Sequence, residues 1–297
     1  MVLGLIYWLS TEMPTPHDIY RTLGRDVKAA YLHTRNTNTD LLFIFQDEKW
    51  TYEMVDELSN KVANHFLSRG YAKGDEVALL LNNCPEYVCI WLGLAKIGVV
   101  TALINTNLKG DSLAHSLNCI DVKALIFGRD FSDAVKEAIP FFTNKDTMTF
   151  YGFSERGSDA KTVVPFPAKS LNALLEEAPS ELTKKVQIHF NDKMLYIYTS
   201  GTTGLPKAAI IRHSRFLWIC AAAKFVAQVG DFETFYNTLP LYHTAGGLVF
   251  VSVVLVFGST MVIRKKFSAS NFWKEAAQHK ATVCPHPLIP AVHHAIL

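Results

Sequence analysis

The chain alternates between short apolar runs and longer segments in which apolar residues recur every three or four positions. Residues 41–45, 77–81, 101–104 and 124–127 are short runs of aliphatic and aromatic side chains, as buried strands require. The segments between them have helical spacing, most clearly at 52–69. This alternation predicts an α/β fold built from parallel βαβ units, with helices on both faces of a sheet.

Helix boundaries are marked by particular residues. Thr51 is a plausible N-cap for the helix that follows it, and Gly70 stands where a left-handed residue ends a helix. Pro85 is expected to open a helix that runs toward Lys96, and Asp111 to cap another.

A second α/β series begins at Met194, after a stretch from 155 to 169 that is rich in Gly, Ser and Pro. It is predicted to contain a helix at 214–226, a strand near Phe235, a strand at 261–263 and a helix from Asn271. We therefore predict five regions. These are a leader at 1–39 that could contact a membrane, a first α/β subdomain at 40–154, a linker at 155–190, the start of a second α/β subdomain at 191–283, and a divergent tail at 284–297.

Composition narrows the class of protein. With 49% hydrophobic and 19% charged positions in 297 residues, the chain can bury a large core and is too apolar to be disordered. A net charge of +2 gives no field strong enough to argue for nucleic acid. The short basic cluster 264–266 is interpreted as a solvated edge, with contact to anionic lipid headgroups as the alternative.

Cysteine usage and apolar runs exclude further classes. The five cysteines form no Cys-x-x-Cys pair, so neither a disulfide framework nor a zinc site is predicted, and no metal ligands are assigned. The apolar runs 2–9 and 248–257 are too short to span a bilayer, and the second is interpreted as a buried core element.

The most informative segment joins an apolar strand to a loop of hydroxyls, glycines and one lysine. The strand is 195–198, and the loop reads Thr199-Ser-Gly-Thr-Thr-Gly-Leu-Pro-Lys207. Gly201 and Gly204 let the backbone approach a ligand closely. The four hydroxyls and the free N–H groups can surround phosphate oxygens, while Lys207 supplies a positive charge. This pattern indicates a loop that binds the phosphates of a nucleoside triphosphate.

Two other interpretations of the loop carry less weight. A Gly-Thr-Thr-Gly stretch alone could be a surface turn, but the preceding strand and Pro206-Lys207 favour a phosphate loop. A Walker-type loop requires Gly-Lys-Ser/Thr at its end, whereas here Pro206 takes the glycine position and Ala208 replaces the magnesium-binding hydroxyl.

His243 follows an expected strand in the segment Leu-Tyr-His-Thr-Ala-Gly-Gly, and ligands of open α/β sheets collect beyond strand ends. A hydrogen-bonded structural histidine is the alternative. The segment loosely resembles an esterase oxyanion loop, but the chain has no Gly-x-Ser-x-Gly. Asn105, Asn107 and Lys109 either face the same ligand site beyond the strand ends or form a capping turn. Arg212 and His213 either line the site or begin a helix.

The phosphate loop resembles the signature of adenylate-forming enzymes, which include acyl-CoA synthetases. Several longer segments are similar to the fatty acid transport proteins, also called very-long-chain acyl-CoA synthetases. These segments are 51–70 (TYEMVDELSNKVANHFLSRG), 91–107 (WLGLAKIGVVTALINTN), 196–214 (YIYTSGTTGLPKAAIIRHS), 239–246 (LPLYHTAG) and 262–273 (VIRKKFSASNFW). The resemblance extends from about Leu41 to Val283 and implies the N-terminal domain of such an enzyme.

By this resemblance, the reaction joins a long-chain or very-long-chain fatty acid to AMP and then to coenzyme A, using ATP and Mg and supporting fatty acid uptake. It implies catalytic roles for Thr202, Lys207 and His243, with Lys207 at the pyrophosphate end and His243 near the acyl and adenylate pocket. The implied nucleotide-binding residues are Tyr196, Ile197, Tyr198, Thr199, Ser200, Gly201, Thr202, Thr203, Gly204, Leu205, Pro206 and Lys207. It further implies a membrane surface as partner, at the cytosolic face of the endoplasmic reticulum or plasma membrane, and allows a homo-oligomer.

After Val283 the sequence departs from the family pattern, with three prolines before residue 297. We expect the second subdomain to be truncated. By the resemblance, the magnesium-holding segment, the ribose-binding aspartate, the hinge and the C-terminal lid domain with its catalytic lysine are expected to be absent. Two hypotheses follow. The first is family function, the ATP-dependent activation of fatty acids. The second is a non-catalytic nucleotide- or lipid-binding fragment that associates with a full-length partner.

Overall fold

The computed structural model describes residues 41–155, 164–200, 206–230 and 232–285. The strands are β1 (Leu41–Phe45), β2 (Glu48–Thr51), β3 (Glu76–Leu80), β4 (Val100–Leu103), β5 (Val122–Gly128), β6 (Thr149–Phe153), β7 (Lys169–Ser170), β8 (Lys193–Ser200), β9 (Pro206–Arg212), β10 (Thr234–Asn237) and β11 (Thr260–Ile263). The helices are α3 (Tyr52–Ser68), α4 (Pro85–Lys96), α5 (Gly110–Asn118), α6 (Ser132–Ala138), α7 (Leu171–Glu176), α8 (His213–Val226), α9 (Val251–Phe257) and α10 (Phe272–Gln278). Short helical turns are η1 (Arg129–Phe131), η2 (Ile139–Phe141) and η3 (Thr244–Phe250).

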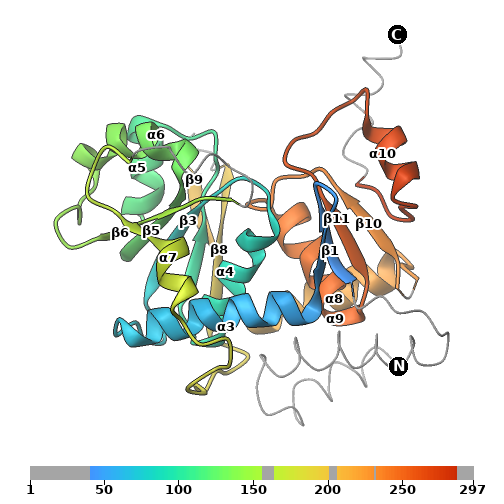
Figure 1. Ribbon diagram of the computed structural model, residues 1–297, viewed down its shortest axis with the longest axis horizontal. Coiled ribbons are helices and arrows are strands. Elements are labelled where there is room, and N and C mark those ends of the chain that lie inside the picture. Colours follow the sequence, from blue (N-terminus) through green and yellow to red (C-terminus); the bar gives the residue numbers. More distant parts are fainter. Residues whose placement is uncertain (1–40, 156–163, 201–205, 231, 286–297) are drawn as a thin grey trace.

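The strands form two sheets that stand side by side (Figure 1). The larger sheet has the order β7-β6-β5-β3-β4-β8-β9, and the smaller has the order β10-β11-β1-β2. Most neighbouring strands are parallel, as predicted, but β8 pairs with β9 and β1 with β2 in antiparallel fashion. The predicted α/β fold with parallel sheets is therefore confirmed, with one antiparallel strand at the edge of each sheet.

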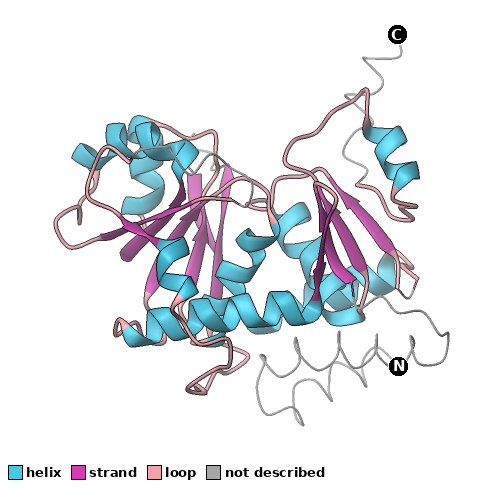
Figure 2. Ribbon diagram, viewed as in Figure 1, coloured by secondary structure: helices cyan, strands magenta, loops and turns pink. Residues whose placement is uncertain are grey.

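Successive side chains of a strand point to opposite faces of its sheet, and this divides the core into layers. Figure 2 shows helices between the two sheets and outside each of them. In β3, Val77 and Leu79 face the cluster that also contains Met261 of β11, so this layer fills the space between the two sheets. Leu80 faces the other side of the large sheet, where α5 and α6 pack. Phe272 of α10 covers the outer face of the small sheet. Five layers result, with helices outside each sheet and between them.

Several predicted helix boundaries are confirmed. Thr51 caps α3 by accepting a hydrogen bond from the Met54 amide at 3.1 Å, and Gly70 has a φ of +81° just beyond the helix. The helix that begins at Pro85 ends at Lys96, as expected. The prediction that Asp111 caps α5 is wrong, because Lys109 occupies the N-cap position and Asp111 lies in the first turn.

Neither sheet is built from one continuous range of the sequence. Strand β1 pairs with β11, more than 200 residues later, through Phe43 and Met261. Strand β8 joins the large sheet beside β4. The division of the chain into subdomains at 40–154 and 191–283, with a linker between them, stays a prediction. Residues 248–257, interpreted as a core element, form parts of η3 and α9, and Val251 to Val256 are buried.

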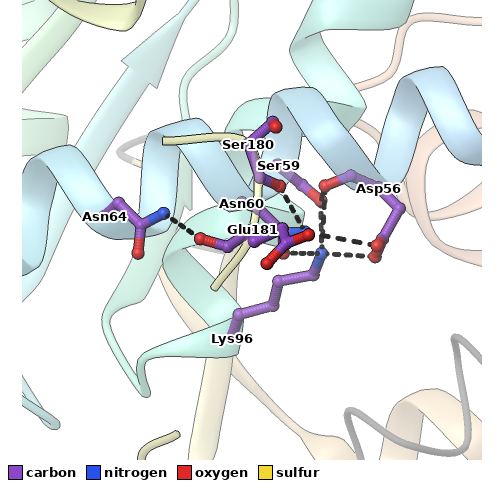
Figure 3. Close-up of polar contacts among 7 residues, drawn as sticks. All are labelled: Asp56, Ser59, Asn60, Asn64, Lys96, Ser180 and Glu181. Atoms are coloured by element: carbon purple, nitrogen blue, oxygen red, sulfur yellow. Dashed lines mark hydrogen bonds and ion pairs between the residues drawn. The ribbon is translucent and has the colours of Figure 1, made fainter. Parts of the chain in front are cut away.

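Helices α3 and α4 cross closely at Gly93, where an added Cβ would lie 2.4 Å from the Ser59 carbonyl oxygen. Close to this crossing the Lys96 ammonium is buried, with Nζ 2.7 Å from Asp56 Oδ1, 2.6 Å from Ser59 Oγ and 2.8 Å from Asn60 Oδ1 (Figure 3).

Two asparagines on successive turns of α3 hold the segment that leads to β8. Asn60 donates to the Ser180 carbonyl at 2.9 Å, and Asn64 donates to the Glu181 carbonyl at 2.7 Å (Figure 3). Thr183 in turn donates from its amide and hydroxyl to Asn64 Oδ1. Side chains of α3 therefore attach residues 179–183 to this helix.

Candidate functional site

The predicted phosphate loop connects two antiparallel strands at one end of the large sheet. Strands β8 and β9 pair from Lys193 with Arg212 to Ser200 with Pro206. Gly201, Thr202, Thr203, Gly204 and Leu205, which we assigned to the site, lie outside the described residues. The described ends of the two strands bring Thr199 directly opposite Lys207, and both residues are exposed. A hydroxyl and an ammonium group are therefore available at the same end of the hairpin.

The strand that leads to the loop is anchored by side chains on both faces. Ile197 packs between the sheets, while Tyr196 and Tyr198 pack on the opposite face. The Tyr196 hydroxyl donates to Glu76 Oε1 at 2.6 Å, and burial raises the pKa of Tyr196. The structure thus places the side chains of these three residues, which the resemblance assigns to the nucleotide site, in the core.

A cleft lies beyond the carboxyl ends of strands from both sheets. It has a volume of about 450 Å³, and its lining includes Asn82, Asn107, Pro240, Tyr242 and Lys265. These residues follow β3, β4, β10 and β11, and ligands of open α/β sheets bind at such strand ends. The cleft therefore lies where ligands of such a fold bind.

The loops after β4 and β10 meet in this cleft. Asn107 Nδ2 donates to the Tyr242 hydroxyl at 3.1 Å, and the Asn107 amide donates to Asn105 Oδ1 at 2.9 Å. The two interpretations of these asparagines are thus both realised, because Asn105 forms a turn while Asn107 lines the cleft. Lys109 instead occupies the N-cap position of α5.

His243 follows Tyr242 and precedes η3. Its ring is exposed and packs at a tilt against the Tyr242 ring, with centroids 4.6 Å apart. Partial burial lowers the pKa of His243 below its usual value, so the imidazole is mostly neutral at pH 7. A neutral imidazole can donate one hydrogen bond and accept another, which suits a group that orients a carboxylate or an acyl phosphate.

Two glycines after His243 allow a close backbone approach. A Cβ on Gly247 would lie 1.7 Å from the Leu241 carbonyl oxygen, and one on Gly246 would lie 2.6 Å from the Pro240 carbonyl oxygen. The start of η3 therefore packs directly on the backbone that carries His243. Since any larger residue would force these segments apart, the Gly-Gly pair fixes how His243 leaves its loop.

Asn83 is an important residue that sequence reasoning missed. Its buried side chain donates to the carbonyls of Leu239 at 2.9 Å and Arg264 at 3.0 Å, and accepts from the Leu241 amide at 2.8 Å. One side chain after β3 thus holds the loops after β10 and β11. A buried asparagine that satisfies backbone groups of distant loops has no local sequence signal beyond its place at a strand end.

Other basic residues are mostly paired. Arg264 contacts Glu275 at 2.8 Å, and Lys265 contacts Glu155 at 2.8 Å, whereas Lys266 is exposed. Arg264 and Lys265 are thus half-buried and ion-paired, and Lys265 and Lys266 also line the cleft, so only Lys266 fits the interpretation of 264–266 as a solvated edge. Arg212 is the last residue of β9, at the far end of the strand from Lys207, and its side chain donates to the Asn191 carbonyl. It is also the N-cap residue of α8, so it begins the helix. His213, the first residue of α8, is buried.

Within the described ranges, no helix combines the length and the apolar character needed to cross a bilayer. The same part of the chain holds no group of three or more His, Cys, Asp or Glu side chains placed to bind a metal ion.

The loop end of the hairpin and the cleft both lie at the carboxyl ends of strands in an α/β protein, where ligands of such folds bind. The sequence profile of AMP-binding enzymes matches residues 32–297, and the chain belongs to this family.

The chain is similar to long-chain fatty acid transport protein 1 of Rattus norvegicus, with 42% identity over 235 residues, which are 79% of this chain and 36% of that protein. Long-chain fatty acid transport protein 2 of Rattus norvegicus is 35% identical over 250 residues, 84% of this chain and 40% of that protein. A medium/long-chain-fatty-acid CoA ligase of Mycobacterium tuberculosis is 33% identical over 249 residues, 82% of this chain and 38% of that protein. The chain therefore spans well under half the length of these relatives.

Solved structures share the fold. The N-terminal domain of FACL13 from Mycobacterium tuberculosis superimposes with a TM-score of 0.74 at 24% identity, covering 92% of this chain and 62% of that chain. The anthranilate CoA ligase AuaEII, solved with anthranoyl-AMP, gives a TM-score of 0.75 at 22% identity, covering 91% and 49%. At these identities the likeness establishes the fold alone.

Proposed function

We propose that this chain provides the ATP-handling part of a long-chain or very-long-chain fatty acid CoA ligase. In this reaction a fatty carboxylate attacks the α-phosphorus of ATP, forming an acyl-adenylate and releasing pyrophosphate. The thiol of coenzyme A then attacks the acyl carbon and releases AMP. The observation that carries the proposal is the exposed Lys207 opposite Thr199 at the loop end of the hairpin, in a chain of the AMP-binding enzyme family.

The first step brings two anions together, so a site for it must neutralise charge and hold the reactants in line. Lys207 supplies a cation at the pyrophosphate end, and Thr199, Thr202 and Thr203 supply hydroxyl groups for phosphate oxygens. Magnesium accompanies ATP in this proposal and binds largely through the phosphates themselves.

His243 is proposed to orient the fatty carboxylate. Its exposed ring lies beside Tyr242, which lines the cleft beyond the strand ends, and its lowered pKa keeps the ring uncharged. An uncharged imidazole can hydrogen-bond the carboxylate without forming an ion pair that would quench its nucleophilicity.

The names of the relatives support fatty acid as the substrate class, and membrane association is proposed on the same ground. In this proposal the protein works at the cytosolic face of the endoplasmic reticulum or plasma membrane, and a homo-oligomer is compatible with it. Division of the chain into two subdomains joined at 155–190 is part of the same proposal.

Pyrophosphate release tests the proposal. Purified chain is incubated with MgATP and a long-chain fatty acid, and pyrophosphate is measured with and without the acid. The expected result is MgATP binding that Lys207→Met weakens strongly, and acid-dependent release that the same variant reduces would assign the first step of the reaction to this chain itself. ATP binding without release would instead favour a non-catalytic nucleotide-binding protein that works with a partner, and absence of both binding and release would refute the proposal.

A further inference from the structure

Two adjacent residues of α5 contact both strands of the hairpin near its loop. His115 Nε2 lies 3.2 Å from the carbonyl oxygen of Pro206 in β9, and the carbonyl of Ser116 accepts a hydrogen bond from the Tyr198 hydroxyl in β8. Because a carbonyl oxygen only accepts, His115 must carry its hydrogen on Nε2 in this contact. Helix α5 therefore forms hydrogen bonds to both strands of the hairpin.

The hydrogen bond to Pro206 acts on the residue that follows it. The Pro206 carbonyl and the Lys207 amide belong to one planar peptide unit, so fixing the carbonyl fixes the position of the Lys207 Cα, and the pairing of Lys207 with Thr199 then sets the direction of its side chain. Among the strands that the structure describes, β9 is the edge of the large sheet, and none of them holds its backbone from outside. The His115 side chain of α5 holds the backbone here instead, at the residue that precedes Lys207.

We infer that His115 is a positioning residue that aims Lys207 at the phosphates beyond the α-phosphate of a bound nucleoside triphosphate. The inference rests on the proposed function of Lys207. It assigns His115 no contact with the nucleotide, so loss of the hydrogen bond should weaken binding only of ligands that reach Lys207. ATP has β- and γ-phosphates for this contact, whereas AMP has none.

The test compares the affinities of the full chain for MgATP and AMP by isothermal titration calorimetry. His115→Phe keeps an aromatic ring of similar size but removes the N–H donor, and His115→Gln restores an N–H donor. The MgATP Kd of His115→Phe should rise about two- to tenfold, the range that one hydrogen bond allows, while its AMP Kd stays that of wild type. His115→Gln should recover most of the MgATP affinity.

Two further variants separate the possible outcomes. Asn118→Ala changes the same helix away from the hairpin, where Asn118 donates to the Phe141 carbonyl at 2.8 Å, and should alter neither Kd. Lys207→Met should weaken MgATP binding at least as much as His115→Phe does. Thermal unfolding of each variant verifies that it is folded, and His115→Ala replaces His115→Phe if the ring does not fit.

The inference is overturned if His115→Phe binds MgATP like wild type while Lys207→Met does not, a result that leaves the proposed function intact. It is also overturned if His115→Phe weakens MgATP and AMP equally, since that reports a general structural role. Unchanged MgATP affinity in Lys207→Met would reject the proposed function itself, and the inference with it.

Discussion

Removing one partner of the buried Lys96–Asp56 pair should cost unequal amounts, depending on which partner is removed. The Lys96 side chain is 3% exposed and that of Asp56 is 26% exposed, with 2.7 Å between Nζ and Oδ1. Asp56→Ala removes the carboxylate that lies against the ammonium group of an almost fully buried side chain. Lys96→Met replaces the lysine with an uncharged side chain of similar length and leaves a carboxylate that can still be hydrated.

The expected costs follow from this difference in exposure. Breaking a buried pair destabilises a protein by about 3 to 5 kcal/mol when the remaining charge stays buried, which applies to Asp56→Ala. For Lys96→Met we expect about 1 to 2 kcal/mol, because the remaining carboxylate is partly solvated and the buried ammonium disappears. The double variant should be more stable than Asp56→Ala alone, since it contains no buried charge.

Urea unfolding at pH 7, followed by circular dichroism, measures these differences as shifts in midpoint at constant m-value. Asp75→Asn is the matched control, because the charge it leaves is that of Lys123, whose side chain is 53% exposed, and the amide keeps an acceptor for the Ala72 N–H, so it should cost less than about 1 kcal/mol. Equal losses for Asp56→Ala and Lys96→Met, or a larger loss for Lys96→Met, would refute the reasoning from exposure.

Three further predictions concern the two sheets and their core. Asn83→Ala removes three hydrogen bonds between loops of the two sheets and should lower the free energy of unfolding by about 2 to 4 kcal/mol, whereas Asn82→Ala, whose one described contact is 3.5 Å long, should change it little in urea melts. Gly247→Ala places a Cβ 1.7 Å from a carbonyl oxygen and should destabilise by about 2 kcal/mol or more, while Gly152→Ala, whose nearest neighbour would be 3.5 Å away, should be tolerated, and a neutral Gly247→Ala in thermal melts would contradict the close approach. Burial, with smaller contributions from Arg69 and Lys169, lowers the pKa of His65 to about 4, so the unfolded state binds more protons between pH 4 and 6.5. The stabilisation from neutral His65 is complete above pH 6.5 and is lost as the pH falls through 4, so His65→Phe should lose less stability than wild type between pH 7 and 4.5, and parallel pH curves for the two proteins would disprove the assignment.

Local signals were sufficient for most of the elements that carry the site. The cap at Thr51, the proline that opens α4 and the left-handed Gly70 each act through their own backbone, so sequence alone locates them. The strand before the phosphate loop is also predicted by a local signal, since its apolar residues are contiguous.

Features that depend on distant partners were not predictable. Strands β1 and β11 pair although more than 200 residues separate them in the sequence. Strand β2 has no apolar run that would predict it, because Glu48 and Lys49 are exposed edge residues. The antiparallel course of β9 was missed because a Gly/Thr-rich loop has no fixed direction of exit. The roles of Asn83 and His115 arise from backbone groups of other elements, which no spacing in the sequence indicates.

Lys207 is the cation that the proposed function requires to bind the triphosphate. The decisive measurement is the Kd for MgATP of the wild type, Lys207→Met and Arg212→Met, the last removing an exposed cation from the opposite end of the same strand. We predict that Lys207→Met raises this Kd by about tenfold or more, as loss of a charged hydrogen bond implies, and that Arg212→Met leaves it unchanged. Equal affinities of wild type and Lys207→Met would contradict the account.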